Sequence, residues 1–176
     1  MRWVALLKGV NLGGNRKLPM ADLRRFLADL GFHDVITLLA SGNAVFNAED
    51  DDAARLEGQL ERAARSALNI DTAWLLRSHA DLVATVAANP FCDAAKAHPN
   101  HLLVHFHREP FPVALLDALD HDGPERLAAQ GRELFVDYPV DIGHSKLPQA
   151  MARAKFPRIV TARNWNTVLK LTDLAA

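Results

Sequence analysis

Short apolar runs alternate with helically spaced apolar residues in the first half of the chain. The run at residues 3–7 ends in a glycine-rich loop, which is typical of a strand. Pro19 suits the first position of the following helix, and Gly31 suits its left-handed stop. Further strands are expected at 35–40, 44–47 and 72–76, with a second helix after the acidic residues 49–52. The order strand–helix–strand–strand–helix–strand predicts a ferredoxin-like arrangement.

The second half repeats this plan in part. Its patterns predict a strand at 101–107, a short helix at 112–119, a hairpin at 127–137, and helices at 145–154 and 161–175. We therefore expect an α+β protein with two ferredoxin-like or related halves. Each half would have an antiparallel sheet with helices packed on one face.

One stretch of the chain resembles a linker between these halves. Ser78 followed by Asp81 is typical of a capping box, so a helix is expected to run to about Ala88, where Asn89-Pro90 ends it. Residues 89–100 then lack a clear pattern. The expected domains are residues 1–88 and residues 101–176.

The balance of charge limits the classes of partner. The 176 residues include 20 Lys and Arg against 21 Asp and Glu, which gives a net charge of −1. This argues against a basic nucleic-acid-binding surface over the whole molecule, and 7% aromatic residues offer little stacking surface. Cations are nevertheless concentrated at residues 8–25, which carry five of them against one acid. A small anionic ligand is therefore favoured over nucleic acid.

The cysteine count and the apolar runs bear on the compartment. Cys92 is the only cysteine, so no internal disulfide can form, which fits a reducing environment. No stretch has the length of a membrane span, and the N-terminus lacks the pattern of a signal peptide. We expect a cytoplasmic location without membrane insertion.

The loop at residues 8–19 is the strongest candidate for a binding site. It combines glycines, which allow close backbone approach to a ligand, with asparagines and cations. It matches neither the Walker pattern nor the dinucleotide pattern. Either a generic anion-binding loop or a structural Ω-like turn pinned by asparagine side chains remains. As ligand-binding residues we select Lys8, Asn11, Gly13, Gly14, Arg16 and Lys17.

Two further polar segments could contribute to the same site. Ser41-Gly42-Asn43 is typical of a tight turn, but Ser41 and Asn43 could also bind a ligand beside the loop. In the expected C-terminal helix, Arg163 and Lys170 fall on one polar stripe. The stripe could face an anion or simply be solvated, and Asn164 could instead cap the helix.

Catalytic and metal-binding alternatives have weaker support. Ser145 and Lys146 are adjacent and so point in different directions on a helix, which favours Ser145 as an N-cap over a catalytic dyad. His105 and His107 would share one face of a strand, as two zinc ligands could. Because no cysteine pair or H-E-x-x-H pattern accompanies them, an exposed strand face is favoured and no metal site is expected.

Several segments taken together resemble a known family. These are KGVNLGGNRKLPMADLRRFLADLGF, ASGNAVF, AANPF, SKL and TARNWNTVLKL. They are similar to motifs of the bacterial family called domain of unknown function 1697, over nearly the whole chain from Trp3 to Leu174. Lys8 stands where arginine is usual in that family. The resemblance implies a shared fold and a common site, but it identifies no reaction, and the cofactor stays unknown.

The leading hypothesis is a binding protein for an anionic, phosphorylated small molecule. The first alternative is an enzyme acting on a phosphorylated substrate, for which Ser41, Ser145-Lys146 and Asp141 are the available groups. The second is an interaction protein whose motifs are purely structural and whose sheet edges pair into a homo-oligomer.

Overall fold

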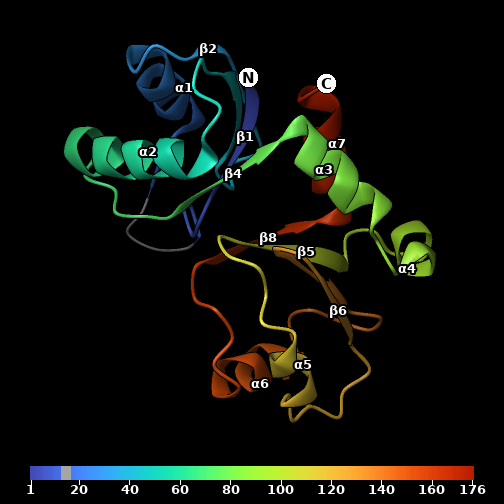
Figure 1. The fold of residues 1–176 in the computed structure, drawn as a ribbon. Helices are drawn as coiled ribbons and strands as arrows, with labels where there is room; N and C mark the ends of the chain where they lie inside the picture. Colours follow the sequence, from blue (N-terminus) through green and yellow to red (C-terminus); the bar gives the residue numbers. More distant parts are fainter. Residues whose placement is uncertain (13–16) are drawn as a thin grey trace. The chain divides into compact units, whose positions relative to one another are not determined.

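The chain forms two compact units (Figure 1). The computed structural model describes residues 1–12 and 17–176. The first unit comprises Met1–Val83 together with Lys170–Ala176, and the second comprises Ala84–Leu169. The domain limits expected at residues 88 and 101 stay a prediction of the sequence.

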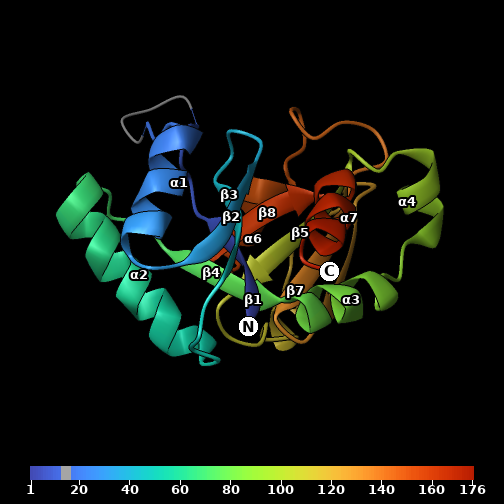
Figure 2. The same cartoon turned by 90° about the horizontal axis from the view of Figure 1, so that it is seen from above.

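The first unit contains the ferredoxin-like element order. Its elements are β1 (Arg2–Leu7), α1 (Met20–Asp29), β2 (His33–Leu38), β3 (Asn43–Asn47), α2 (Ala53–Leu68) and β4 (Trp74–Ser78). The strands form one antiparallel sheet in the order β2-β3-β1-β4. Both helices cover the same face of this sheet (Figure 2). The α+β plan expected for this half is confirmed.

The core of the first unit lies between the sheet and its two helices. Alternate residues of β1, Trp3, Ala5 and Leu7, point into it and are almost fully buried. They meet the apolar faces of α1 and α2, which include Leu23, Phe26, Leu27, Leu56 and Leu60. Burying each of these side chains contributes about 1.5–3 kcal/mol to folding, so the helical spacing seen in the sequence fixes which faces meet.

Both helices of this unit have defined ends. The Asp52 side chain accepts a hydrogen bond from Arg55 N at 3.0 Å and caps the start of α2. Gly31 follows α1 with a φ of +86°, and the next residue, Phe32, donates back to Leu27 O at 3.1 Å. This is a Schellman motif with glycine at its left-handed position, as the sequence predicts.

The expected capping box at residues 78–81 is also confirmed. Ser78 Oγ accepts from Asp81 N at 3.1 Å, and the Asp81 carboxylate accepts from Ser78 N at 2.8 Å. The helix that follows, α3, spans His79–Ala87.

The second unit repeats the plan of the first. Its elements are α4 (Cys92–Ala97), β5 (Leu102–His107), α5 (Ala114–Asp117), β6 (Arg126–Gln130), β7 (Glu133–Asp137), α6 (Leu147–Arg153) and β8 (Val160–Asn164). The helix α7 (Trp165–Leu174) begins in this unit, and its residues from Lys170 onward belong to the first unit. The sheet order, β6-β7-β5-β8, corresponds strand for strand to that of the first unit. Its core joins Leu134 and Val136 of β7 to Phe111 and Leu147. Two ferredoxin-like halves are thus present.

The correspondence extends to strand register. In the first sheet Val4 of β1 pairs with Arg77 of β4, and in the second sheet Val104 of β5 pairs with Arg163 of β8. Each arginine is buried, and each donates from Nη1 to the carbonyl of the preceding residue. The two halves therefore share a buried arginine at the same sheet position.

The helix expected at 161–175 is wrong in its first turn. Residues 160–164 form the strand β8, in which buried Thr161 and Arg163 alternate with exposed Ala162. The helix α7 begins only at Trp165, and Asn164 Oδ1 accepts from Thr167 N at 2.9 Å. Asn164 is therefore the helix cap that the sequence left as one option.

One other segment is more ordered than the sequence suggests. The stretch expected to be a linker contains the helix α4. At the C-terminus, the Arg2 guanidinium donates to Leu174 O at 3.0 and 3.1 Å, which ties the last residues to β1 of the first unit.

In the part of the chain that the structure covers, no helix combines the length and apolar character needed to cross a membrane.

Candidate functional site

The end of β1 is the point where the candidate loop begins. Leu7 N donates to Gly42 O at 2.9 Å, and Lys8 N donates to Ala73 O at 3.0 Å. Thr72 Oγ1 also donates to Lys8 O. The backbone of Lys8 is thus held by the segment that leads into β4, while its side chain is half-buried.

Asn11 joins the loop to the turn between β2 and β3. Its Nδ2 donates to Ala40 O at 2.7 Å and to Leu18 O at 2.8 Å, and its Oδ1 accepts from Leu18 N at 2.8 Å. Its backbone is left-handed, with a φ of 57°, a conformation that asparagine tolerates better than most residues. The two polar segments of the first unit are therefore brought together, and both amide hydrogens of Asn11 are used in doing so.

Gly42 permits the turn to lie directly on the end of β1. Its φ is +80°, and a Cβ at this position would lie 2.4 Å from Val10 Cγ2 and 2.9 Å from Leu7 Cβ. Both distances are far below van der Waals contact. Only glycine satisfies both the backbone conformation and the close approach.

Ser41 and Asn43 have different roles in this turn. Asn43 is fully buried, and its Nδ2 donates to Leu38 O at 2.8 Å and to Ser41 Oγ at 3.0 Å. Asn43 therefore supports the turn from inside and has no surface to offer a ligand. Ser41 is half-buried at the same end of the sheet as Lys8.

The remaining loop residues lie toward α1. Lys17 is exposed and Leu18 is buried, whereas Gly13, Gly14 and Arg16 lie outside the described residues. Lys17 also lines a cavity of about 340 Å³ between the start of α1 and the end of α2. Because Asp22 and Asp29 line it too, this cavity has no net preference for an anion.

The expected stripe of Arg163 and Lys170 does not exist as one helix face. Arg163 belongs to β8 in the second unit, where it is 7% exposed and donates from Nη1 to Thr161 Oγ1 at 2.7 Å and to Ala162 O at 2.8 Å. Burial lowers its pKa to about 10. Lys170 is exposed on α7 and belongs to the first unit. The prediction that Arg163 is an outer charge is wrong. The spacing of apolar residues extended the expected helix into residues that form the strand β8.

The serine considered for catalysis is held in a structural network. Ser145 Oγ accepts from Leu147 N at 3.1 Å and so supports the start of α6, but the N-cap residue is Lys146 and not the expected Ser145. It also donates to the Glu125 carboxylate, whose other oxygen is 2.7 Å from His121 Nε2. Although burial opposes it, these two hydrogen bonds lower the pKa of Glu125. The carboxylate separates the serine from the histidine, so the order does not fit a nucleophile activated by a base.

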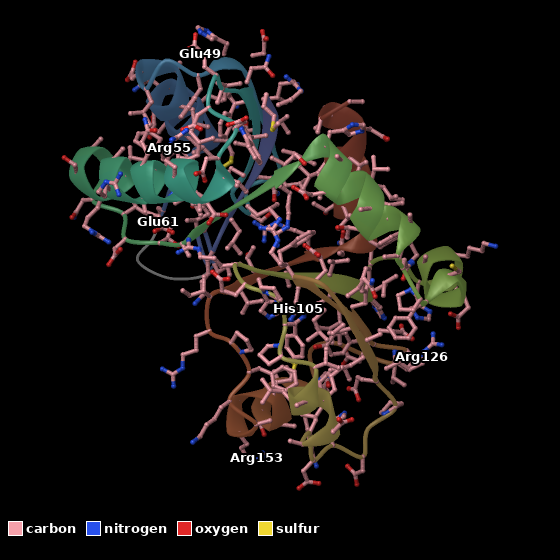
Figure 3. All side chains as sticks on the ribbon, viewed as in Figure 1. Glu49, Arg55, Glu61, His105, Arg126 and Arg153 are labelled. Carbon is pink, nitrogen blue, oxygen red and sulfur yellow. The ribbon has the colours of Figure 1, made fainter. Side chains whose placement is uncertain are left out.

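The histidines of β5 are not on an exposed face. His107 is 2% exposed, and its Nδ1 lies 3.2 Å from Arg132 O. His105 lies on β5 on the side of the sheet toward α6 (Figure 3), and burial, reinforced by the charge of His107, lowers its pKa to about 4. The shared face was predicted, but its burial was not. Among the residues that the structure describes, no three His, Cys, Asp or Glu side chains gather as a metal site would require.

Comparison with known proteins agrees with this architecture. A family model described as protein of unknown function (DUF1697) matches residues 1–135. No curated protein matches the chain. A solved structure of a conserved bacterial protein from Streptococcus pneumoniae is 26% identical, with a TM-score of 0.80, and the match covers 99% of this chain and 98% of that one. Because the family match spans most of the 176 residues, the chain belongs to the family of domain of unknown function 1697.

Proposed function

We propose that the protein is a cytoplasmic binding protein for an anionic, phosphorylated small molecule. The ligand would bind at the N-terminal loop surface, which consists of Lys8, Lys17 and Ser41. Gly13, Gly14 and Arg16 are further members on the strength of the sequence alone.

The observation that carries the proposal is the bridge from Asn11 to Ala40. It joins two segments 29 residues apart at the end of β1, where Lys8 and Ser41 lie. A loop that is fixed at its ends spends less conformational entropy when it closes on a ligand. The bridge therefore holds the polar turn that contains Ser41 beside the cationic, glycine-rich loop.

The side chains of the surface suit a phosphate group. Lysine ammonium groups make short, charge-assisted hydrogen bonds to phosphate oxygens, and a serine hydroxyl can add one more donor. Lys170 stays a proposed outer charge because it is exposed and belongs to the first unit. Asn11, Asn43 and Arg163 act in support of the fold instead, for the reasons given by their hydrogen bonds and burial.

A thermal-shift experiment tests the proposal. Pyrophosphate, tripolyphosphate and nucleoside triphosphates should raise the Tm of the wild-type protein, because a ligand that binds only the folded state stabilises it. The double variant Lys8→Ala with Lys17→Ala should lose this shift. Arg62→Ala with Lys96→Ala removes two exposed cations elsewhere and should keep it. An unchanged Tm for the wild-type protein with all these compounds would refute the proposal.

The same samples separate the alternatives. Turnover of a phosphorylated substrate would favour an enzyme, and light scattering that reports a stable oligomer would favour an interaction protein. Binding that falls steeply between low and moderate salt would point to nucleic acid, because release of condensed counterions drives that association.

A further inference from the structure

A second cavity, distinct from the N-terminal loop surface, lies wholly within the second unit. It has a volume of about 610 Å³ and is lined by β5, by the end of α6 and by the segment that connects α6 to β8. This volume is in the range of small-molecule sites. The residues that matter for its chemistry are His105, His107, Met151, Lys155, Phe156 and Arg158.

One of the residues that line the cavity carries an unsatisfied polar atom. His105 Nε2 is buried and has no hydrogen-bond partner within residues 1–12 and 17–176. Leaving such an atom unpaired costs about 1–3 kcal/mol, so native structures rarely do it without a reason. A ligand atom that bonds to His105 would recover this energy.

The rim of the cavity is cationic. Lys155 and Arg158 are both exposed and both line the cavity, and within the described part of the chain no Asp or Glu lines it. The exposed ammonium group of Lys155 beside a partly closed space favours an anionic group there.

Lys155 occupies a backbone position at which glycine is normally favoured. Its φ is 57°, Lys155 N donates to Ala152 O at 3.1 Å, and Phe156 N donates to Met151 O at 3.1 Å. These bonds make a Schellman motif like the one that ends α1 at Gly31, but with a lysine in the left-handed position. A strained residue of this kind is a reason to look for a function of its side chain.

The wall between the rim and His105 is apolar and well supported. Met151, Phe156 and Val160 contribute to it. The Phe156 ring packs edge-on against the Phe111 ring, with 5.1 Å between the ring centroids. The Phe111 ring in turn packs against the His107 ring, with 5.2 Å between their centroids. A ligand in this cavity would therefore place an apolar body against a fixed aromatic cluster.

We propose that this cavity binds an amphipathic organic anion, with its acid group at Lys155, its apolar body against Phe156 and Met151, and a polar atom hydrogen-bonded to His105. The shared chemistry is an acid headgroup on an apolar body. A carboxylic acid and a phosphate monoester both provide it.

Isothermal titration calorimetry on the full chain tests this with four probes. Octanoate and phenyl phosphate have both parts, octanol has only the body, and inorganic phosphate has only a headgroup. The wild-type protein should bind at least one of the first two more tightly than either of the last two. Equal affinity for octanol and octanoate would overturn the proposal, and so would binding of inorganic phosphate alone at this cavity.

The variant Lys155→Gly keeps the Schellman motif and removes the ammonium group. Its affinity for the bound acid should fall about tenfold, the equivalent of one charge-assisted hydrogen bond, without loss of Tm. The neighbouring exposed Arg153→Gly removes a cation of α6 that does not line the cavity and should bind normally in samples that remain folded. Wild-type affinity in Lys155→Gly would contradict the proposal.

The imidazole NMR signals of His105 report on the part of the cavity that this residue lines. They should move when the acid binds, and His105→Phe should weaken binding while it fills the same space. Signals that stay unchanged at saturation would overturn the role of His105. Lys8→Ala with Lys17→Ala should leave all these results unchanged, so failure of this site and failure of the N-terminal loop surface are separable.

Discussion

Asn11 donates a hydrogen bond from its side-chain amide to the backbone carbonyl of Ala40, with 2.7 Å between the two atoms. The same amide group donates to Leu18 O, and its oxygen accepts from Leu18 N. One side chain therefore connects both ends of the loop at residues 8–19 and the turn that follows β2. This arrangement holds the loop and the turn in fixed positions beside Lys8 and Ser41.

The substitution Asn11→Asp tests the bridge. Aspartate keeps the shape, the tolerance of left-handed backbone and the acceptor for Leu18 N, but it removes both donors. We expect the free energy of unfolding to fall by about 1–3 kcal/mol in urea denaturation, because two carbonyl groups lose their partners. Asn69→Asp is the matched control, since Asn69 is also left-handed but exposed, at the end of α2. A cost at Asn11 no larger than that at Asn69 would contradict the assignment.

The close approach of Gly42 to β1 gives a second prediction. Gly31→Ala introduces a left-handed alanine into open space, which should cost about 1–2 kcal/mol. Gly42→Ala carries the same backbone penalty and also places a Cβ against Val10 and Leu7. We expect it to cost about 1–3 kcal/mol more than Gly31→Ala in denaturant unfolding. Equal costs for the two substitutions would show that the turn does not lie on β1 as described.

The lysine in the Schellman motif of α6 predicts a stabilising substitution. Lys155→Gly should raise the free energy of unfolding by about 0.5–1 kcal/mol, because the relief of left-handed strain exceeds the entropy gained by the unfolded chain. Differential scanning calorimetry would show this as a higher Tm. The reverse substitution in the matching motif, Gly31→Lys, should lower the Tm, and a fall in Tm for Lys155→Gly would argue against a strained Lys155.

Burial of His105 predicts a specific pH dependence of stability. Its folded pKa of about 4 lies below the ordinary value of 6.5, so the unfolded chain binds more protons between these two values. Stability should therefore fall as the pH drops from 6.5 to 4, by up to about 3 kcal/mol from this group. Parallel urea titrations of the wild-type protein and His105→Gln should show a flatter profile for the variant.

His144 contributes in the opposite direction and cancels in this comparison. The hydrogen bond that His144 donates to the Asp141 carboxylate, and the negative charge of that carboxylate, raise the pKa of His144. Its stabilisation is therefore present at low pH and is lost as the pH rises through the folded value. Because both proteins contain His144, the difference between their profiles isolates His105. Parallel profiles would contradict the buried, neutral state of His105.

Much of the fold could be predicted from local patterns. Apolar periodicity and the signals at Pro19, Gly31, Ser78 and Asp81 depend on neighbouring residues, so they identify most elements of the first unit. The same reasoning failed for β8, because only five residues alternate there and one of the inward positions is an arginine. Any pattern of hydrophobicity counts arginine as polar and therefore predicts that a buried arginine lies on the surface.

The candidate sites were less predictable because they depend on contacts distant in sequence. The loop composition identified Lys8 and Asn11 as candidate site residues. It did not indicate that the side-chain amide of Asn11 donates hydrogen bonds to Ala40 O and Leu18 O. The shared face of His105 and His107 follows from strand geometry. The cavity that this face lines also involves residues from Met151 to Val160, which are more than 40 residues away in the sequence.

The most direct test of the central claim is NMR mapping of pyrophosphate binding to the uniformly ¹⁵N-labelled protein. The account predicts that the backbone amides of Lys8 and Ser41 and the side-chain amide of Asn11 shift together along one saturating curve. Lys8→Ala with Lys17→Ala should abolish these shifts, and Arg62→Ala with Lys96→Ala should preserve them. Shifts confined to other parts of the chain, or none at saturating pyrophosphate, would contradict an anion site at the N-terminal loop surface.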